Sequence, residues 1–317
     1  MKHGGLIITA SVFASLALGL GAGYVFFADR SAHPKVIFTN PNLAQGPIRE
    51  SLTIEKRQKL TSEITSFLEQ KKREGKVSEG SVYFRDLNNG PWFGINEFFE
   101  FSPASLLKVP LAMAYFHAAE NNPDLLTQQI EFNGPRGISV VHYPPKLPLE
   151  EQKIYSVTEL ITRMLQDSDN DATNILAQFL PKDQINEVYK DLGIQTVVDY
   201  DTYRISVRDY ASFLRILYNS TYLSQESSEE LLAMMSNSSF TQGISAGVPN
   251  NIKVVQKFGE RTLDEQQGVY QLHNCGIVYA PEQPYMLCVM TQGNDYDELA
   301  NVIKEVSSRV YTAVKAR

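Results

Sequence analysis

The spacing of hydrophobic residues divides the chain into segments of different predicted structure. Between Leu52 and Lys72 hydrophobic residues recur every three or four positions, which predicts an amphipathic helix. From Ser81 to Phe99 two short hydrophobic runs flank Asn88-Asn89-Gly90-Pro91, and this pattern predicts a β-hairpin. Most of the chain from Ser102 to Asn251 then returns to helical spacing.

Two helix starts in this region carry capping signals. Ser156-Val157-Thr158-Glu159 has the form of a capping box, in which serine and glutamate satisfy each other's free backbone amides. Ser206 precedes a hydrophobic stripe that begins at Tyr210, so a further helix is expected to start there.

Strand-like spacing returns near the end of the chain. Three strands are predicted at Ile252–Phe258, Val269–Tyr279 and Pro284–Thr291, followed by a helix at Leu299–Val314. Because strands come from both ends of the chain and helices from its middle, we expect an α+β fold. It would be an antiparallel sheet flanked by helices, with an all-helical lobe inserted at about residues 102–245.

The N-terminal segment differs from the rest of the chain. Leu6 to Ala28 contains no charged residue and is long enough to cross a bilayer as a helix. A cleaved signal peptide is the alternative, but its hydrophobic region is usually shorter. We therefore predict an N-terminal transmembrane helix within residues 1–28, a proline-containing linker at 29–49 and one domain at 50–317.

Composition excludes several classes of function. The net charge is −7, and the longest basic run is Lys71-Lys72-Arg73, so no nucleic-acid partner is expected. Two cysteines and five histidines, without a ligand-like spacing, predict no metal site. We expect no cofactor.

The first candidate for chemistry is the run from Ser105 to Lys108. Three residues apart on a helix is one face, so the lysine amine can approach the serine hydroxyl and remove its proton. The preceding Ser102-Pro103 is expected to cap this helix, and Pro110 to make its start irregular. The alternative is a solvated helix face, because such a spacing is common.

Two further groups are weak signals when taken alone. Ser168-Asp169-Asn170 places a hydroxyl and an amide between two helices, where the alternative is a loop that caps the following helix. Lys257-Phe258-Gly259 ends a strand-like run, where the alternative is an edge-strand lysine that discourages aggregation.

Taken in this order, the three groups resemble the signatures of the class A β-lactamase-like family of penicillin-recognising serine enzymes. The resemblance extends from about Gly80 to Gln292. It includes the flanking runs Phe101-Ser102-Pro103-Ala104-Ser105-Leu106-Leu107-Lys108-Val109-Pro110, Tyr155-Ser156-Val157-Thr158-Glu159-Leu160, Gly243-Ile244-Ser245-Ala246-Gly247-Val248-Pro249 and Cys275-Gly276-Ile277-Val278-Tyr279.

The resemblance implies a role for each matching residue. Ser105 would be the nucleophile, Lys108 its proton acceptor and Ser168 the donor to the departing nitrogen. Lys257 would hold Ser168 and attract the substrate carboxylate, and Asn170 would bind Lys108 and the substrate amide. The strand after Lys257, with Gly259, would line the substrate site, and the amides of Ser105 and Glu260 would form the oxyanion hole.

The sequence departs from this family at two places. Family members carry a glutamate in a long loop that activates water for deacylation, but no glutamate lies between Glu187 and Glu226. The stretch that should house this loop runs from Gly193 to Ser206, where Asp199 and Asp201 are the remaining carboxylates, and both are expected to be turn residues. Phe258 stands where the family has a small hydroxyl residue, and its side chain is expected to face the core.

The resemblance implies a membrane-anchored serine hydrolase, acylated on Ser105 by β-lactams or D-alanyl peptides and slow to deacylate. Its substrate would be a small molecule, its reaction an amide hydrolysis of the β-lactamase type, and its domain extracytoplasmic. The alternatives are a D,D-carboxypeptidase-like cell-wall enzyme, a hydrolase of other esters or amides, and a non-catalytic surface scaffold that retains the fold.

The chain has two cysteines, Cys275 and Cys288, on the last two predicted strands. A turn centred between Pro281 and Pro284 places them close together but two residues out of register. Buried free thiols are therefore expected rather than a disulfide.

Overall fold

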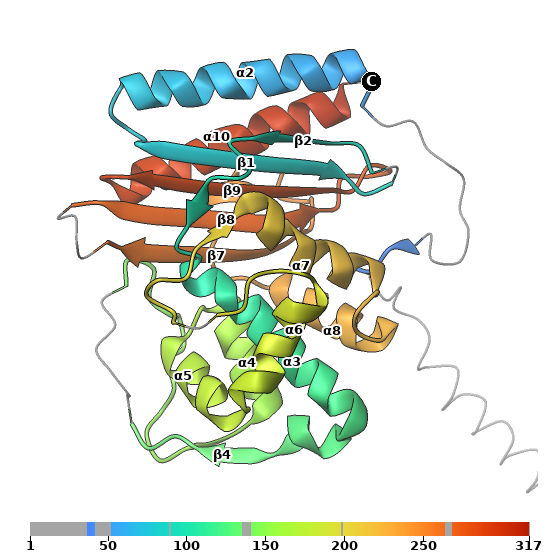
Figure 1. Cartoon of the computed structure of the whole chain (residues 1–317), viewed down its shortest axis with the longest axis vertical. Coiled ribbons are helices and arrows are strands. Elements are labelled where there is room, and N and C mark those ends of the chain that lie inside the picture. The colour runs from blue at the N-terminus through green and yellow to red at the C-terminus, as the bar shows by residue number, and fades with distance from the viewer. Residues whose placement is uncertain are drawn as a thin grey trace, which may run out of the picture. The chain divides into compact units, whose positions relative to one another are not determined.

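A five-stranded antiparallel sheet lies at the centre of the fold, with its strands in the order β2-β1-β9-β8-β7 (Figure 1). The computed structural model describes residues 37–41, 52–88, 90–134, 141–197, 199–263 and 268–316. The strands are β1 (Glu79–Asp86), β2 (Trp92–Ile95), β7 (Val254–Thr262), β8 (Tyr270–Val278) and β9 (Tyr285–Gly293). The predicted hairpin is confirmed, since Val82 pairs with Ile95, and the C-terminal strand β9 pairs with β1 from the other end of the domain.

Two long helices cover one face of this sheet (Figure 1). They are α2 (Ile54–Arg73) and α10 (Tyr296–Lys315), which confirm the two predicted helices with small shifts of their ends. Helix α2 buries Leu60, Ile64, Phe67 and Leu68, the stripe that the spacing predicted. Its first turn is closed by Thr53, whose side chain accepts a hydrogen bond from the amide of Lys56.

The other face of the sheet packs against a lobe of helices. Both predicted caps are present: Ser156 and Glu159 form a capping box, and the Ser206 hydroxyl accepts a hydrogen bond from the amide of Asp209. The short helix α9 (Gly243–Ala246) packs against α10 instead. The helices of the lobe are η2 (Ala104–Leu107), α3 (Lys108–Asn121), η3 (Pro123–Thr127), α4 (Val157–Gln166), α5 (Asn170–Phe179), α6 (Lys182–Asp191), α7 (Val207–Asn219) and α8 (Gln225–Met235). Two short ladders complete it, β3 (Glu100–Phe101) with β6 (Ile205–Ser206) and β4 (Gln129–Glu131) with β5 (Ile154–Ser156).

A short segment of the predicted linker is docked onto this domain. Phe38 and Thr39 are buried, and their backbone amides donate to the two carboxylate oxygens of Glu229 at 2.6 and 2.8 Å. Tyr279 donates its hydroxyl to the carbonyl of Phe38. The sequence pattern did not predict this docking, because two residues carry no periodicity.

The predicted membrane span, residues 6–28, lies outside the described residues. In the part of the chain that the structure describes, none of the helices combines the length and the hydrophobicity needed to cross a bilayer. The remaining domain boundaries stay a prediction.

The expectation for the two cysteines is wrong. Cys275 and Cys288 are direct partners in the ladder between β8 and β9, and they form a disulfide. The reason is the position of the turn: the ladder ends at the pair Val278 and Tyr285, so the loop centre lies one residue earlier than the prolines suggested. Because of this shift, Cys275 and Cys288 face each other directly in the ladder.

Candidate active site

Ser105 lies in a distorted helical turn at the edge of the sheet. The turn η2 is a 3₁₀ helix that continues directly into α3, which confirms the irregular start predicted from Pro110. Ala104 has φ 50°, a left-handed conformation that costs a non-glycine residue free energy. Ser105 itself is partly exposed.

Ser102 does not cap this helix, contrary to expectation. Its hydroxyl accepts a hydrogen bond from Arg261 at 3.1 Å, and its carbonyl oxygen lies 2.9 Å from Nε2 of His273. The amide of Thr291 donates to Nδ1 of His273, so Nε2 carries the proton and donates to Ser102. Burial lowers the pKa of His273 to about 4, which keeps the ring neutral.

Gly259 allows strand β7 to approach the Ser105 turn. A Cβ atom at this position would lie 2.9 Å from the carbonyl oxygen of Pro103 and 3.1 Å from the amide nitrogen of Leu106. Both neighbours are backbone atoms and cannot rotate away. The close packing of β7 on the turn therefore requires glycine here.

Lys108 is buried and reaches across to the loop between α4 and α5. Its side chain is 3% exposed. The Nζ atom donates to the carbonyl oxygen of Ser168 at 2.6 Å, to the Ser168 hydroxyl at 3.1 Å and to Oδ1 of Asn170 at 2.8 Å. Among the described residues, no hydrogen bond joins Lys108 to the Ser105 hydroxyl, although the two are one turn apart.

The loop between α4 and α5 caps the following helix and also contacts Lys108. Asp169 caps α5, because its Oδ1 accepts a hydrogen bond from the amide of Ala172 at 2.9 Å. Ser168 has φ 57°, a conformation that few residues other than glycine adopt, and this turns both its carbonyl and its hydroxyl toward Lys108. The alternative interpretation of Ser168-Asp169-Asn170, a loop that caps the following helix, is therefore confirmed. The same loop also makes a polar contact with Lys108.

The buried position of Lys108 changes its proton affinity. Burial lowers the pKa of Lys108 to about 7, against the opposing effects of Asp169 and Glu260. A neutral amine keeps two hydrogens, enough for the carbonyl of Ser168 and the amide of Asn170, and gains a lone pair. Lys108 can then accept a proton near neutral pH.

Lys257 also points inward. It lies in the middle of β7 rather than at its end, because the strand continues to Thr262, and its side chain is 0% exposed. The alternative of a solvent-facing edge lysine is therefore wrong. Its Nζ donates to the carbonyl of Phe258 at 2.8 Å and lies 4.2 Å from the centre of that ring. Burial and the nearby charge of Lys108 hold the pKa of Lys257 well below its ordinary value.

Phe258 faces the core, as expected. Its ring stacks on Phe240 with centroids 4.4 Å apart and meets the edge of Tyr143 at 5.9 Å. Glu260 lies two residues further along β7. Its carboxylate accepts hydrogen bonds from the backbone amides of His142 and Tyr143 at 2.7 and 3.0 Å. This contact of Glu260 was not predicted, and neither was the role of Arg261 or His273 at Ser102. A single sequence gives no signal for such long-range contacts.

Asp199 and Asp201 are turn residues, as expected. The carboxylate of Asp199 accepts hydrogen bonds from the amide of Asp201 and the hydroxyl of Thr202. Asp201 forms an ion pair with Arg261 at 3.1 Å. Neither carboxylate is bound to Lys108 or Ser168.

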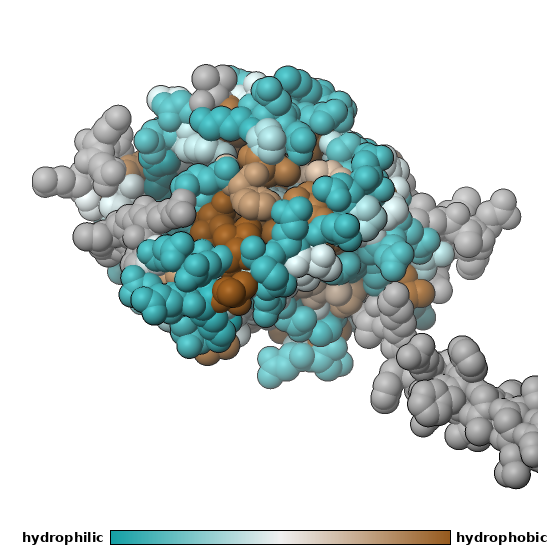
Figure 2. All heavy atoms as spheres, turned by 90° about the horizontal axis from the view of Figure 1, so that it is seen from below, coloured by the Kyte–Doolittle hydropathy of each residue, from teal (hydrophilic) through white to brown (hydrophobic). Residues whose placement is uncertain are grey.

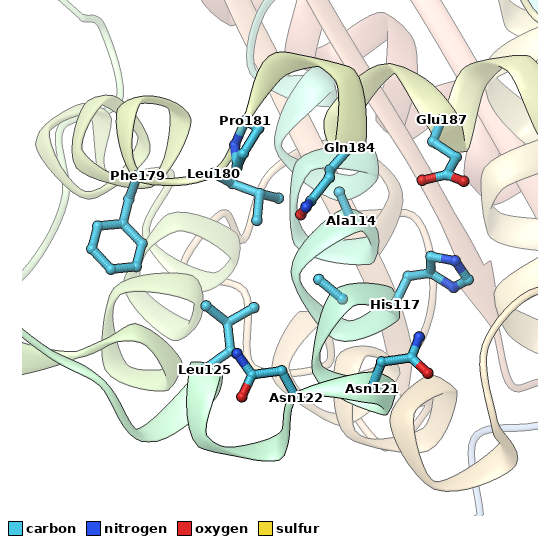
Figure 3. A pocket seen from close by; sticks show the side chains of 11 residues that line it. Ala114, His117, Asn121, Asn122, Leu125, Phe179, Leu180, Pro181, Gln184 and Glu187 are labelled. Carbon is cyan, nitrogen blue, oxygen red and sulfur yellow. The ribbon is translucent and has the colours of Figure 1, made fainter.

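A cavity of about 440 Å³ lies elsewhere in the helical lobe (Figure 3). His117 and Asn121 of α3 face Gln184 and Glu187 of α6 across it, and Phe179 lies at its side. Phe179 is 43% exposed, and Figure 2 shows hydrophobic side chains gathered on the face of this lobe seen from below. The residues that line the cavity include none of the predicted site residues.

The structure thus brings together Lys108, Ser168 and Asn170 by hydrogen bonds, with Lys257 beside them. Gly259 packs against the turn that carries Ser105, and Glu260 acts electrostatically on both lysines. In the described residues, groups of three or more metal-ligating side chains are absent. The arrangement of Lys108, Ser168 and Asn170 is suited to proton transfer from a serine hydroxyl.

Known structures share this fold. A β-lactamase from Xanthomonas campestris is 20% identical, with a TM-score of 0.68 over 80% of this chain and 98% of that one. PBP-A is 23% identical, with a TM-score of 0.64 over 84% and 98%. A PBP-A variant seen as an acyl-enzyme with penicillin G is 22% identical, with a TM-score of 0.65 over 81% and 96%.

Sequence comparison supports the same assignment. The β-lactamase regulatory protein BlaB of Streptomyces cacaoi is 28% identical over 137 residues, which cover 41% of this chain and 40% of that protein. The family model described as the β-lactamase enzyme family matches residues 59–314. The fold, the ordered serine and lysine groups and this match together show that the chain belongs to the β-lactamase enzyme family.

Proposed function

We propose that this protein is a membrane-anchored serine hydrolase, acylated on Ser105 by β-lactams or D-alanyl peptides and slow to release the acyl group. The observation that carries the proposal is the buried Lys108 amine, hydrogen-bonded to Ser168 and Asn170 one helical turn from Ser105. Its pKa of about 7 makes it a base at neutral pH.

The acylation step follows from this arrangement. The Oγ atom of Ser105 attacks the carbonyl carbon, and its proton passes to the Lys108 amine. The negative oxygen that forms is stabilised by the amides of Ser105 and Glu260. The carbon–nitrogen bond then breaks, and the proton returns through Lys108 and the Ser168 hydroxyl to the departing nitrogen. The proton lost by Ser105 is thus the one gained by the leaving group.

Slow deacylation rests on the carboxylates near the loop between α6 and β6. Asp199 uses its oxygens within the turn, and Asp201 is paired with Arg261. Hydrolysis of the acyl-enzyme needs a base that activates water, and such a base typically contributes about 10²–10⁴-fold. Without it, the acyl-enzyme persists.

The only support for a membrane anchor at residues 6–28 is the sequence of this segment, which contains no charged residue. An extracytoplasmic domain follows from the kind of substrate proposed. Detergent partitioning of the full-length chain, compared with a chain that begins at residue 37, tests the anchor. Recovery of both in the aqueous phase would contradict it.

The experiment that tests the catalytic proposal is intact-mass spectrometry after treatment with benzylpenicillin. We expect a stable adduct on the full-length protein and none on Ser105→Ala. Ser78→Ala is the matched control, because Ser78 is an exposed serine in the loop between α2 and β1, and it should form the adduct normally. An unmodified wild-type protein, or an adduct that survives Ser105→Ala, would rule out the proposal.

A second candidate is a β-lactam-responsive or scaffolding protein without turnover. The absence of a deacylating glutamate favours it, and the name of the Streptomyces cacaoi relative describes a regulatory protein. Hydrolysis of a chromogenic cephalosporin over many turnovers, lost in Lys108→Ala, would exclude this candidate. A folded protein that forms no adduct with any β-lactam would support it.

A further inference from the structure

Exposed aromatic side chains gather at strand β2, which forms the edge of the sheet opposite β7 (Figure 1). Trp92 opens this strand and is 38% exposed. Phe98 and Phe99 follow in the connection to β3 and are 67% and 44% exposed. Single exposed hydrophobic residues are ordinary on a protein surface, but a group of large ones marks a surface that contacts a partner or a membrane.

Arg208, at the start of α7, joins two of these rings. Its guanidinium carbon lies 5.2 Å from the centre of the Trp92 ring and 5.0 Å from the centre of the Phe98 ring. Its backbone amide donates to the carbonyl of Glu97 at 3.4 Å, which ties the start of α7 to the same loop. These contacts make one continuous surface, the aromatic–arginine patch, which consists of Trp92, Phe98, Phe99 and Arg208.

The guanidinium of Arg208 keeps its N–H donors for a ligand. Arg208 is exposed, and among the residues that the structure describes no acceptor is bound to its side chain. The carboxylates nearest in the loop, Glu97 and Glu100, form no ion pair with it in the described part of the chain. A guanidinium stacked on rings leaves its N–H edge open, and this edge matches the oxygens of a phosphate group.

Two further arginines border the patch. Arg57 of α2 donates to the carbonyl of Trp92 at 3.3 Å, and Arg85 of β1 is the ladder partner of Trp92. Aromatic rings surrounded by arginines are typical of residues at the boundary between lipid headgroups and acyl chains. The positive side chains also suit an anionic surface, although the chain as a whole has a net charge of −7.

The length of the chain before the domain restricts how far a bilayer can lie from this surface. The proposed span ends at Ala28, and Phe38 is fixed to the domain by its bonds with Glu229 and Tyr279. Only residues 29–37 lie between them. At about 3.6 Å per extended residue, this tether reaches roughly 35 Å at most. The domain is therefore held within contact range of the lipid headgroups.

We propose that the aromatic–arginine patch rests on the anionic lipid headgroups of the membrane that holds the proposed anchor. The rings of Trp92, Phe98 and Phe99 lie at the boundary between headgroups and acyl chains, and Arg208 binds a lipid phosphate. The inference rests on the membrane anchor of the proposed function. It adds which face of the domain contacts the lipid, and it does not depend on the chemistry of Ser105.

Fluorescence of the full-length protein in vesicles tests this inference. The chain contains one tryptophan, so tryptophan emission reports on Trp92 alone. Vesicles of phosphatidylglycerol and phosphatidylcholine are prepared with and without bromine atoms on the acyl chains, because bromine quenches only a tryptophan that touches it. We expect a clear loss of Trp92 emission in the brominated vesicles. Equal emission in the two kinds of vesicle would overturn the inference, and this comparison needs no variant.

Phe99→Ser and Phe179→Ser separate the patch from exposed phenylalanines in general. Phe179 is the matched control, because it is 43% exposed and lies at the end of α5 in the helical lobe. We expect Phe99→Ser to weaken the quenching of Trp92 and Phe179→Ser to leave it unchanged. The opposite result would assign the lipid contact to the helical lobe and overturn the inference.

Arg208→Gln tests the phosphate contact, with Arg73→Gln as control because Arg73 is an exposed arginine at the far end of α2. Arg208→Gln should lower the ratio of docked to free domain about fivefold, the effect of one basic residue at an anionic surface. Each variant is compared in brominated and unbrominated vesicles, so the lost stacking on Trp92 cancels. A ratio unchanged in Arg208→Gln would count against the phosphate contact.

The outcomes separate this inference from the proposed function. A full-length protein that stays in the aqueous phase on detergent partitioning removes both the anchor and the inference. An anchored protein whose Trp92 is not quenched keeps the anchor and removes only the inference. Acylation of Ser105 is measured by intact mass and is decided independently of both.

Discussion

The carbonyl oxygen of Ser168 lies 2.6 Å from Nζ of Lys108, closer than the Ser168 hydroxyl at 3.1 Å. This contact exists because Ser168 adopts φ 57°, which directs its carbonyl toward the buried amine. The backbone therefore orients Lys108, and the hydroxyl of Ser168 remains available for proton transfer. A residue in a costly conformation beside a buried lysine is a feature expected of an active site.

Acylation should depend on pH through Lys108. Burial lowers the pKa of Lys108 to about 7, so the neutral amine that accepts a proton becomes common only above that pH. We expect the acylation rate constant to rise about tenfold per pH unit below 7 and to level off above it. Rates of adduct formation between pH 5 and 9 measure this. Lys108→Ala should be slower by about 10²–10⁴-fold, and a profile of unchanged shape in that variant would assign the titration to another group.

Ser168→Ala and Ser168→Gly separate the hydroxyl of Ser168 from its backbone conformation. Both remove the hydroxyl, so both should slow acylation by a similar factor, about 10²-fold or more. Glycine adopts the positive φ without strain, so the free energy of unfolding should be about 1 kcal/mol higher for Ser168→Gly than for Ser168→Ala. Urea titrations measure this difference. If Ser168→Gly retains the wild-type rate, the hydroxyl does not transfer the proton.

Asp199→Ala tests whether Asp199, one of the two carboxylates in the loop between α6 and β6, activates water. Asp199 accepts two hydrogen bonds within its turn, so its loss should cost about 1 kcal/mol of unfolding free energy. The decay of the acyl-enzyme, followed by mass after removal of excess penicillin, should not change. A markedly slower decay would identify Asp199 as a deacylating base, and Asp183→Asn, on the surface of α6, serves as the control.

The pairing of Cys275 with Cys288 predicts that the denatured protein contains no reactive thiol before reduction and two afterwards. A thiol assay in denaturant checks this directly. Reduction should also lower the free energy of unfolding by about 3 kcal/mol, the usual contribution of a cross-link that closes a short loop. Two thiols in the untreated protein would contradict the disulfide and agree with the free thiols expected from the sequence.

His273 should make stability depend on pH below neutrality. Burial lowers its pKa from 6.5 to about 4, so between these values the unfolded chain binds a proton that the folded chain does not. Stability contributed by the neutral ring is therefore lost as the pH falls through this range, by at most about 1.4 kcal/mol per pH unit. Chemical denaturation at several pH values, with His273→Gln as comparison, measures it. If the pH dependence of the unfolding free energy is the same in His273→Gln as in the wild-type protein, it comes from other residues.

Much of the fold could be predicted because periodicity reports burial. Leu60 and Ile64 are buried where their spacing placed them, and the caps at Ser156 and Ser206 close the helices that they were expected to close. Element ends were less accurate. Lys257 was placed at a strand end, because the polar residues after Phe258 break the alternation while the ladder with β8 continues.

The site was predicted from motifs and not from spacing. A serine and a lysine one turn apart are common, and only their order with Ser168 and Lys257 gave them significance. The contacts of Ser102 with His273 and Arg261 join residues far apart in the chain, and one sequence contains no record of such pairs. The disulfide was missed for a different reason, because a one-residue error in a turn centre changes every pairing in a hairpin.

The pairing of β1 with β9 means that the two ends of the domain sequence are neighbours in the finished sheet. Strand β9 also supports β8, and β8 supports β7, which carries the lysine beside Ser105. During synthesis the sheet cannot be completed until nearly the whole polypeptide has left the ribosome. Folding is therefore expected to be late and slow, since distant segments must meet before any of them is stable.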